Sequence, residues 1–566
     1  MVLVLDGYIM PEMTTRFILF GRQSANIPRY VMSFARRSGV TRTPLGLKFS
    51  IRIRDMCGFL FLKQASSSRI TKNAFARALE RQEWRGPDSK RVVALDNGST
   101  FIGHTRLAII DPIARSDQPM ASKDGRYLIA FNGEIYNHVQ LRERLSLECV
   151  TGSDTETILA GYIAVGASIV NMLEGMFAFV IYDRLGKSWF SARDRFGIKP
   201  LYVYESLDIA VIGSEPAPIA VLLGLSVDYE SVDEWRLGRR PVPGCSFFSE
   251  LKEQLPATYR SSLEPSTVSY WQLEPLFSNY KQSTFEKILK VSVKNHELSD
   301  VSNVALLSGG LDSAVITAIS DVKRVYSVGL DCNNEIIEAR ETAQRLGKVF
   351  VDVMVSEQEM IDTWKFLTRI RGEPIAVPNE ALIFMACKRM SANEKVILTG
   401  EGADELLFGY DGIFRWALCG QWNGVNDFLM RYGYSASVKP TDRLVDFIET
   451  QRKDKALIEF VEDFFYKFHL PGLLRRMDFA SMAASKEARV PFVDREIVSY
   501  MYRLPFDIKI TNSESKVPLR ALAKKIGLSG ALSRKKIGFS AATNAESNRF
   551  DEYQKFQDIV LEELKW

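Results

Sequence analysis

The feature that most constrains the fold is a short loop, residues 308–313, between an apolar run and a helical stretch. Residues 303–307 are a candidate for a buried strand, and residues 314–320 continue with a helical pattern. From about residue 282 onward, apolar runs of this kind alternate with helical stretches, at 304–307, 325–330, 349–355 and 396–399. This rhythm predicts an α/β fold with a doubly wound parallel sheet, followed after about residue 412 by a mostly helical part.

The loop itself has the sequence SGGLDS. Its two glycines let backbone N–H groups approach phosphate oxygens closely, and the start of the helix adds partial positive charge. Ser308 and Ser313 can donate hydrogen bonds, whereas Asp312 would repel a bare phosphate and is expected to hold Mg²⁺. The GK[ST] ending of the Walker loop is missing here. We interpret the loop as a pyrophosphate-binding site; a glycine-rich turn without a ligand is the alternative.

A second loop, residues 400–405, follows the apolar run 396–399 and carries Glu401, Asp404 and Glu405. Ligands of open parallel sheets bind beyond the carboxyl ends of neighbouring strands. Three carboxylates beside the first loop therefore suit Mg²⁺ binding and proton transfer. A solvated acidic turn is the alternative interpretation, which the pairing with the first loop disfavours.

The 566 residues are too many for a single core, and the sequence patterns divide them into four parts. Residues 57–270 show short apolar runs, such as 127–131, broken by turn residues, which indicates sheet with a few helices. Residues 282–545 hold the predicted parallel sheet and helical part, and 546–566 are expected to form a C-terminal tail. Residues 1–56 are an Arg-rich extension, with eight Arg and one Lys against three acidic residues.

Composition excludes several classes of protein. Hydrophobic residues make up 46% and charged residues 25%, as in ordinary globular domains, and no stretch approaches the roughly 18 unbroken apolar residues of a membrane span. Six scattered cysteines without a CxxC pair, and only four histidines, argue against a disulfide framework or structural zinc and favour a reducing, cytoplasmic setting. The net charge of +4 arises in the extension, which alone carries +6, so we expect neither nucleic-acid nor membrane binding.

Several motifs in collinear order resemble those of glutamine-hydrolysing asparagine synthetases, and they span nearly everything after residue 56. In the C-terminal half they are SGGLDSA at 308–314, TGEGADE at 399–405, LRRMDFASM at 474–482, EARVPFVD at 487–494 and KVPLR at 516–520. In the N-terminal half they are MCG at 56–58, RGPD at 85–88, RLAIID at 106–111, NGEIYNH at 132–138, GSD at 152–154 and residues 193–202. The resemblance implies an N-terminal αββα Ntn-hydrolase sandwich and a C-terminal ATP-pyrophosphatase domain, α+β overall.

The resemblance also implies the residues of a glutaminase site. The thiol of Cys57 would attack the glutamine amide, with the α-amine of the same residue as base, because its ordinary pKa of about 7.7–8.0 suits proton transfer near neutrality. Asn132 and Gly133 would form the oxyanion hole. The implied glutamine-binding residues are Arg106, Leu107, Ala108, Ile109, Ile110, Asn132, Gly133, Glu134 and Asp154. For Arg106 and Asp154, a surface ion pair is the alternative.

The second implied site activates a carboxylate with ATP and Mg²⁺ as cofactors. The acceptor would attack the α-phosphate to give an acyl-adenylate and pyrophosphate, and ammonia carried inside the protein would displace AMP. Glu401 would take a proton from ammonia and Lys516 would neutralise phosphate charge, with Mg²⁺ on Asp312 and Asp404. The implied ATP-binding residues are Leu307, Ser308, Gly309, Gly310, Asp312, Ser313, Val328, Thr399 and Gly400. The partners are these small molecules, and a homodimer is a hypothesis that the sequence leaves open.

The position of Cys57 departs from the family pattern. An internal cysteine has an amide nitrogen in place of the amine, so the base would be missing. We expect translation to start at Met56, whose removal exposes Cys57 and makes the residues before it an upstream artefact. A cleaved leader and an Arg-rich organelle presequence are alternatives. An unprocessed full chain is predicted to lack glutaminase activity and to depend on free ammonia.

The region expected to select the acceptor also departs from the pattern. Asparagine synthetases carry a Thr-Thr-Ile-Arg-rich segment where this chain has RGEPIAVPNE at 371–380, and 348–352 replaces a His-containing segment. Aspartate is the leading acceptor, and a sugar uronate in surface-polysaccharide biosynthesis or a natural-product acid is the alternative. Asn379 and Glu380 are candidates for binding the acceptor or for capping the loop. A β-lactam-forming or peptide-cyclising relative is disfavoured by the retained Cys57 and the motif at 132–134, and a non-catalytic scaffold by both intact centres.

Overall fold

The computed structural model describes residues 57–65, 69–86, 88–111, 114–276, 279–331, 334–533 and 549–566. All of them belong to one compact unit, 52–566. The Arg-rich extension and the predicted start at Met56 lie outside the described residues.

The N-terminal part contains two antiparallel six-stranded sheets. In spatial order the first consists of β10 (Lys252–Glu253), β8 (Tyr202–Glu205), β9 (Ile209–Gly213), β1 (Gly58–Gln64), β3 (Thr100–Arg106) and β2 (Ser89–Leu95). The second consists of β12 (Glu264–Ser269), β11 (Thr258–Ser261), β7 (Ser188–Arg193), β6 (Gly175–Asp183), β5 (Tyr127–Ile135) and β4 (Met120–Ala121). The helices are α1 (Lys72–Glu80), α2 (His138–Leu145), α3 (Asp154–Val165), α4 (Ile169–Met172), α5 (Pro216–Leu223) and α6 (Tyr229–Gly238).

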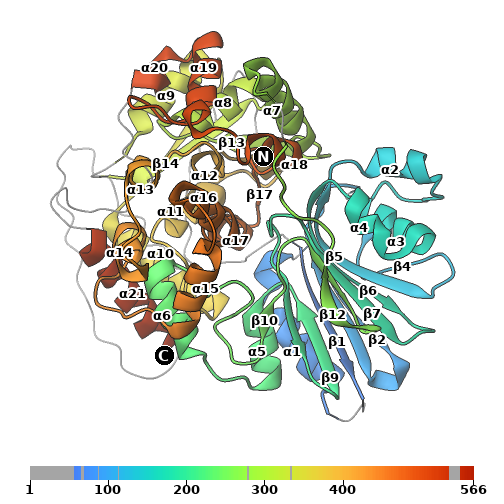
Figure 1. Ribbon diagram of the computed structural model, residues 1–566. Helices are drawn as coiled ribbons and strands as arrows, with labels where there is room; N and C mark the ends of the chain where they lie inside the picture. The colour runs from blue at the N-terminus through green and yellow to red at the C-terminus, as the bar shows by residue number, and fades with distance from the viewer. Residues whose placement is uncertain are drawn as a thin grey trace, which may run out of the picture. The chain divides into compact units, whose positions relative to one another are not determined.

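The alternation of side chains along β1 explains how the two sheets pack. Phe59 and Phe61 point into the apolar layer between the sheets, whereas Leu60 and Leu62 point outward into the cluster that holds α1 and α5. The second sheet is covered on its outer face by α2, α3 and α4 (Figure 1), and Ile158 of α3 belongs to the apolar cluster between these helices and the sheet. The four layers confirm the predicted αββα sandwich.

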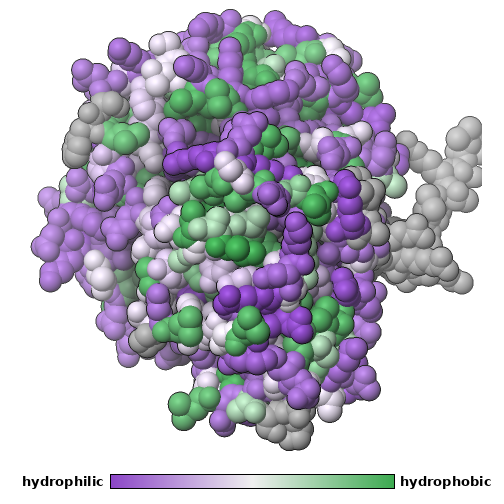
Figure 2. All heavy atoms as spheres, turned by 90° about the vertical axis from the view of Figure 1, so that its right-hand side faces the viewer, coloured by the Kyte–Doolittle hydropathy of each residue, from purple (hydrophilic) through white to green (hydrophobic). Residues whose placement is uncertain are grey.

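One stretch among the described residues, 154–172, is long and apolar enough to cross a membrane by length and composition, with a mean hydropathy of 1.2. It contains α3, a 3₁₀ turn at Gly166–Ser168 and α4. Ile158, Leu159, Ile169 and Val170 are all at most 2% exposed, so its apolar face covers the second sheet. Figure 2 views the molecule from the right-hand side of Figure 1 and shows a surface on which hydrophobic residues are interspersed among hydrophilic ones.

The C-terminal part contains a five-stranded sheet in which every pair is parallel. Its spatial order is β15 (Val349–Val355), β14 (Arg324–Leu330), β13 (Ser302–Leu306), β16 (Glu394–Leu398) and β17 (Glu487–Arg489). The connecting helices are α7 (Gln282–His296), α8 (Leu311–Ile319), α9 (Ile336–Arg345), α10 (Glu357–Arg371) and α11 (Glu380–Arg389). The strand order reverses between β13 and β16, which is where open α/β sheets bind their ligands.

Both faces of this sheet are covered, which confirms the doubly wound arrangement. Val304 and Leu306 of β13 belong to the cluster that contains residues of α10 and α11. Ala305 and the following Leu307 belong to the cluster that contains residues of α7, α8 and α19. A strand buried on both faces must be apolar on both, so the run at 304–307 shows no alternation.

The helical part after residue 402 follows the expectation, with one exception. Its helices are α12 (Ala403–Leu406), α13 (Asp411–Cys419), α14 (Val425–Tyr432), α15 (Asp442–Arg452), α16 (Leu457–Phe464), α17 (Leu470–Ala483), α18 (Arg495–Met501), α19 (Val517–Lys525), α20 (Ser529–Ser533) and α21 (Arg549–Leu564). The exception is β17, a three-residue edge strand that the sequence pattern missed. The stretch expected to be a tail contains α21, which packs on α10 and buries Phe556 and Val560 completely.

Candidate active sites

Cys57 lies immediately before β1, and its sulfur contacts the backbone of Leu107. The Leu107 N–H donates to Sγ at 3.2 Å, and the thiol lies 3.4 Å from the Leu107 carbonyl. The Cys57 carbonyl accepts a hydrogen bond of 3.0 Å from Nε of Arg85. Burial raises the pKa of the Cys57 thiol to about 11. At neutral pH the thiol therefore stays protonated unless a base takes its proton.

Asn132 and Gly133, the predicted oxyanion-hole residues, lie on β5. Gly133 has φ of +150°, and a side chain there would come within 2.1 Å of the Met176 carbonyl oxygen, so only glycine fits. Asn132 is 1% exposed, and its Nδ2 has no hydrogen-bond partner among the described residues. A buried donor without a partner is rare and suits an oxyanion that forms only during reaction.

Most of the predicted glutamine-binding residues meet in one cavity of about 460 Å³, measured with its open mouth. It is lined by Cys57, Arg106, Leu107, Ile109, Ile110, Gly133, Glu134 and Asp154, together with other residues. Asn132 and Ala108 are not part of the lining. The Ala108 N–H donates to Asp88 at 3.0 Å and its carbonyl accepts from Lys395 at 3.1 Å, so this residue holds the loop in place.

Arg106 and Asp154 are both buried, so neither side chain takes part in the surface ion pair that was the alternative for each of them. Arg106 is 6% exposed and pairs with Asp117 at 2.7 Å. Asp154 is 5% exposed and accepts hydrogen bonds from the N–H groups of Ile135 and Thr155 at 3.0 and 2.8 Å. Burial raises the pKa of Asp154 to about 6. Both side chains line the cavity with charge that a zwitterionic ligand can meet.

The C-terminal part completes this cavity, which sequence reasoning missed. Met482 of α17 and Glu487 of β17 line it beside Cys57. Arg489 of β17 pairs with Glu134 and with Glu487, both at 2.9 Å and all buried. Glu487 and Arg489 belong to the motif EARVPFVD at 487–494, but the sequence pattern alone does not assign these residues to the first site.

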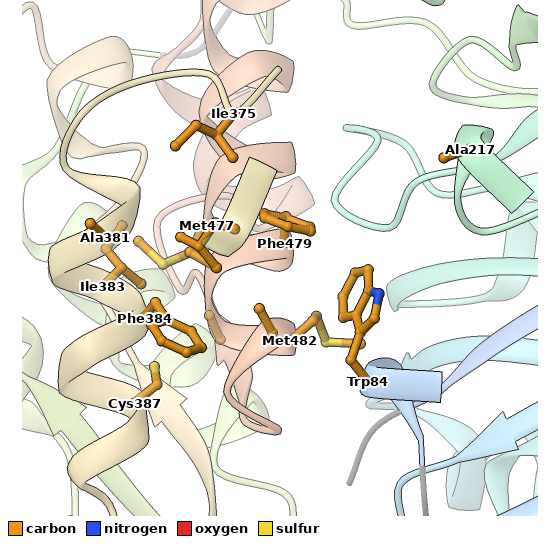
Figure 3. Close-up of a cluster of buried hydrophobic side chains, with 14 of the residues drawn as sticks. Trp84, Ala217, Ile375, Ala381, Ile383, Phe384, Cys387, Met477, Phe479 and Met482 are labelled. Atoms are coloured by element: carbon orange, nitrogen blue, oxygen red, sulfur yellow. The ribbon is translucent and has the colours of Figure 1, made fainter. Parts of the chain in front are cut away.

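An apolar and ionic interface joins the two parts. Trp84 packs edge-to-face on Phe479 of α17 with ring centroids 5.1 Å apart, near Met482 (Figure 3). Beside them, buried Arg85 pairs with Asp478 of α17 at 2.9 Å. Lys199 pairs with the same carboxylate at 3.0 Å. Since Arg85 also donates to the Cys57 carbonyl, Arg85 links α17 to the backbone of Cys57.

In the second candidate site, residues 308–310 lead from β13 into α8, whose N-cap is Gly310. The hydroxyls of Ser308 and Ser313 lie 3.0 Å apart, and the Ser308 hydroxyl accepts from the Gly310 N–H at 3.1 Å. The loop is therefore pre-folded by its own serines around the helix N-terminus. Leu307 and Val328 flank it as buried residues of the sheet.

The two predicted loops are in direct contact, and Gly400 makes this contact possible. A side chain at Gly400 would lie 2.8 Å from the Ser313 backbone nitrogen and 2.9 Å from the Asp312 backbone carbon. Thr399, one residue earlier, donates from its N–H to the Arg489 carbonyl at 3.0 Å. The structure thus brings the predicted residues 308–313 and 399–405 together at the switch point of the sheet.

Lys516 bridges the two carboxylates that were predicted to hold metal. Its Nζ lies 2.6 Å from Asp312 and 2.7 Å from Asp404. Burial works against the charge of Lys516, but the two carboxylates outweigh it and hold its pKa above the ordinary value. Two aspartates that converge on one cation fit Mg²⁺, which is usually bound by one or two carboxylates together with substrate phosphates. Among the described residues no group of three or more acidic, His or Cys side chains gathers as a ready-made metal site.

Glu401 lies beside Arg476 of α17, whose Nη2 donates to its carboxylate. Burial raises the pKa of Glu401 to about 7 against the opposing effect of Arg476. A carboxylate with a pKa near neutrality suits a general base. Arg476 also donates to Asn379 Oδ1 at 3.2 Å, so Asn379 lies near this centre. Glu380, in contrast, is fully buried and accepts from the N–H groups of residues 376 and 377, so it caps the loop.

Comparison with known proteins agrees with this geometry. Residues 56–271 match a family model described as a glutamine amidotransferase domain, and residues 284–565 match one described as asparagine synthase. A putative glutamine-hydrolyzing asparagine synthetase of Mycobacterium tuberculosis is 28% identical, with 86% of this chain and 87% of the relative covered. Glutamine-hydrolyzing asparagine synthetase 1 of Bacillus subtilis gives the same figures, 28%, 86% and 87%. The enzyme of that name from Arabidopsis thaliana is 30% identical, over 81% of this chain and 72% of its own.

Among solved structures, a glutamine phosphoribosylpyrophosphate amidotransferase from B. subtilis aligns at a TM-score of 0.29 and 14% identity, covering 61% of this chain and 82% of its own. That likeness is too slight to support an argument. The two sheets, the two loops and the family matches define the chain as a glutamine-dependent carbon–nitrogen ligase. More narrowly, it belongs to the glutamine-hydrolysing asparagine synthetase family.

Proposed function

We propose that this protein transfers ammonia from glutamine to a carboxylate activated by ATP, yielding an amide, AMP and pyrophosphate, with aspartate as the leading acceptor. The observation that carries the proposal is the bridge from Lys516 to Asp312 and Asp404, at the ends of two loops that leave neighbouring parallel strands. A phosphate-binding loop, two carboxylates and a lysine at a sheet switch point are the parts that adenylation needs.

In the first half-reaction, the Cys57 sulfur attacks the glutamine amide carbon and ammonia leaves, giving a thioester that water hydrolyses to glutamate. The Asn132 side chain and the Gly133 N–H would hold the oxyanion. Because burial raises the thiol pKa to about 11, the reaction requires a base. The α-amine of an N-terminal Cys57 supplies one, so exposure of Cys57 at the chain start belongs to the proposal.

In the second half-reaction, an acceptor oxygen attacks the α-phosphorus and pyrophosphate leaves. Asp312 and Asp404 are the residues that would hold Mg²⁺, which supplies charge neutralisation to the phosphates. Lys516, which lies between these two carboxylates, would stabilise the departing pyrophosphate. Ammonia then attacks the acyl carbon, Glu401 takes one of its protons, and AMP leaves with the C–O electron pair.

An internal path for ammonia is supported by the course of β17. Glu487 at its start lines the Cys57 cavity, and the carbonyl of Arg489 at its end accepts from Thr399 of the second site. Ammonia released into water near neutral pH would be protonated and lose its nucleophilicity. The described cysteines, which are all free thiols, support the proposed reducing, cytoplasmic setting.

The test uses protein that starts at Cys57, incubated with ATP, Mg²⁺ and glutamine. Glutamate, AMP and pyrophosphate are measured with aspartate and, separately, with glucuronate and other carboxylic acids. Equal amounts of AMP and pyrophosphate that appear only with an acceptor support the proposal. Silence with aspartate but turnover of another acid would replace the acceptor and keep the reaction. No pyrophosphate release with any acid would contradict the proposal.

A further inference from the structure

Arg239 stands out among the arginines that lie near the second site. The next residue, Arg240, pairs with Glu253 at 2.6 Å, and Arg476, which lies near His469 together with Arg239, pairs with Glu401. Arg239 forms no ion pair with an acidic side chain in the part of the chain that the structure describes. An enclosed charge without a counter-ion is costly, so such a charge is usually paired.

The partners that Arg239 does have are neutral. Its Nη2 lies 2.8 Å from Nδ1 of His469, and its guanidinium stacks 4.3 Å above the ring of Tyr434. Burial, followed by the charge of Arg239, holds the pKa of His469 well below its ordinary value. His469 is therefore uncharged and accepts through Nδ1. These contacts orient the guanidinium but leave its positive charge uncompensated.

A chain of contacts connects Arg239 to the loop that carries Glu401. Nε2 of His469 lies 3.2 Å from the Tyr410 hydroxyl, which donates to Glu405 at 2.7 Å. Arg239 also contributes, after Arg476, to lowering the pKa of Glu401 against burial. The unpaired charge therefore belongs to the same centre as the proposed base.

Two tyrosine rings flank Arg239, which is not fully buried. The rings of Tyr434 and of Tyr553 from α21 lie 4.5 Å apart, next to the guanidinium that stacks on Tyr434. Arg239, Tyr434, Tyr553 and Glu401 are all only partly buried, so a ligand can reach them. Arg239 ends α6 with φ of +71°, a conformation at which glycine or asparagine is more common. We name Arg239, Tyr434 and Tyr553 the Arg239 cluster.

We propose, on the basis of the proposed function, that the Arg239 cluster binds a second anionic group of the acceptor, distinct from the carboxylate that is adenylated. The acceptor is then an acid with two anionic groups, such as an amino dicarboxylate. Aspartate meets this requirement, and a uronate with a single carboxylate does not. Arg239 acts on specificity, since it holds the acceptor while Lys516 and Glu401 serve the reacting atoms.

The test compares two pairs of acceptors that differ by one carboxylate: aspartate with β-alanine, and succinate with propionate. Ammonia serves as nitrogen donor, and acceptor-dependent pyrophosphate release is measured for the Cys57-start protein and its Arg239→Gln variant. We expect the parent to prefer the dicarboxylate of a pair, and the variant to lose roughly 100-fold in kcat/KM for it, mainly through KM. The rate with the single carboxylate should stay unchanged.

The matched control is Arg236→Gln on the same helix. Its guanidinium bonds Gln554 at 3.3 Å, away from the loop that carries Glu401, so parent-like selectivity is expected. Unchanged glutaminase activity of Arg239→Gln shows that the fold is retained. Equal losses for both members of a pair, or a parent that prefers single carboxylates, would overturn the inference and leave the proposed function standing. Absence of pyrophosphate release with every acid would remove both.

Discussion

The two centres differ in how complete they are without ligands. In the Cys57 cavity the thiol is protonated, Asn132 Nδ2 has no partner among the described residues, and the amine that would act as base is an amide in the full chain. In the nucleotide centre, Lys516 already neutralises Asp312 and Asp404. For the proposed glutaminase reaction, the first centre therefore requires a covalent change in the protein, namely exposure of the α-amine of Cys57. The second centre requires a ligand that separates the existing ion cluster of Lys516, Asp312 and Asp404.

The sharpest way to separate the centres is to remove the nucleophile. Cys57→Ala in the Cys57-start protein should lower glutamine hydrolysis by more than about 1000-fold, because no other group can form the thioester. Ammonia-dependent pyrophosphate release should persist, since Cys57 takes no part in adenylation. Glutamate release and pyrophosphate release are measured in parallel. The unprocessed 566-residue chain should behave like this variant, and full glutamine hydrolysis by it would contradict the need for the amine.

Removing the ammonium from the second centre should give the opposite separation. Lys516→Met should lower acceptor-dependent pyrophosphate release by about 100-fold or more, because a buried charge that stabilises developing phosphate charge is lost. Glutamine hydrolysis should change little. The control is Lys525→Met on the same helix, since Lys525 is 64% exposed and its pair with Glu286 is worth at most about 1 kcal/mol. A Lys516 variant with normal adenylation would show that the bridge is structural only.

The sequence predicted the nucleotide centre better than the Cys57 cavity, and the reason is topological. Residues 308–313 and 399–405 each follow a strand, and parallel strands place their carboxyl ends at one edge, so proximity follows from the pattern. Glu487 and Met482 reach the cavity only because α17 and β17 pack against the N-terminal sandwich. No local period encodes that contact. The three residues of β17 are also too few to show a strand pattern within a helical region.

Arg239 is a second example of a residue whose position in the folded protein the sequence did not predict. It lies in the sequence of the N-terminal part, yet it stacks on Tyr434 and contacts His469 of the helical part. The sequence around residue 239 contains no motif that marks it, because its distinguishing feature is the lack of an acidic partner among the described residues. This feature can be recognised only in the folded structure, once the partner of every neighbouring carboxylate is known.

The pH dependence of amide formation should also distinguish the second centre from the first. Burial raises the pKa of Glu401 to about 7, so its basic form accumulates only above that pH. Amide formation with ammonia should therefore rise through pH 7, beyond the rise that free ammonia itself explains. Glu401→Gln should abolish the additional rise and lower the rate by about 100-fold. Because the folded carboxyl binds a proton that the unfolded one has released between about pH 4.5 and 7, this group makes stability fall as pH rises there.

The smallest predicted effect tests whether one side chain, that of Lys395, supports the structure around both centres. Lys395 follows the first residue of β16, the strand that leads into the loop with Glu401, and its ammonium holds Asp88 at 2.8 Å and the Ala108 carbonyl at 3.1 Å. Ala108 follows Leu107, whose N–H contacts the Cys57 sulfur. Lys395→Met should therefore raise the KM for glutamine by about 3- to 10-fold, as expected when one partly buried charged contact is lost.

Lys90→Met is the matched control, because Lys90 lies on β2, two residues after Asp88, and its pairs with Glu80 and Glu83, at 3.2 and 3.5 Å, are on the surface. Ammonia-dependent turnover should be the same in both variants, which separates an effect on the glutamine loop from general loss of structure. If Lys395→Met changed ammonia-dependent turnover as strongly as the KM for glutamine, Lys395 would act through β16 on the nucleotide centre. The two centres would then be coupled by that strand and not merely supported by it.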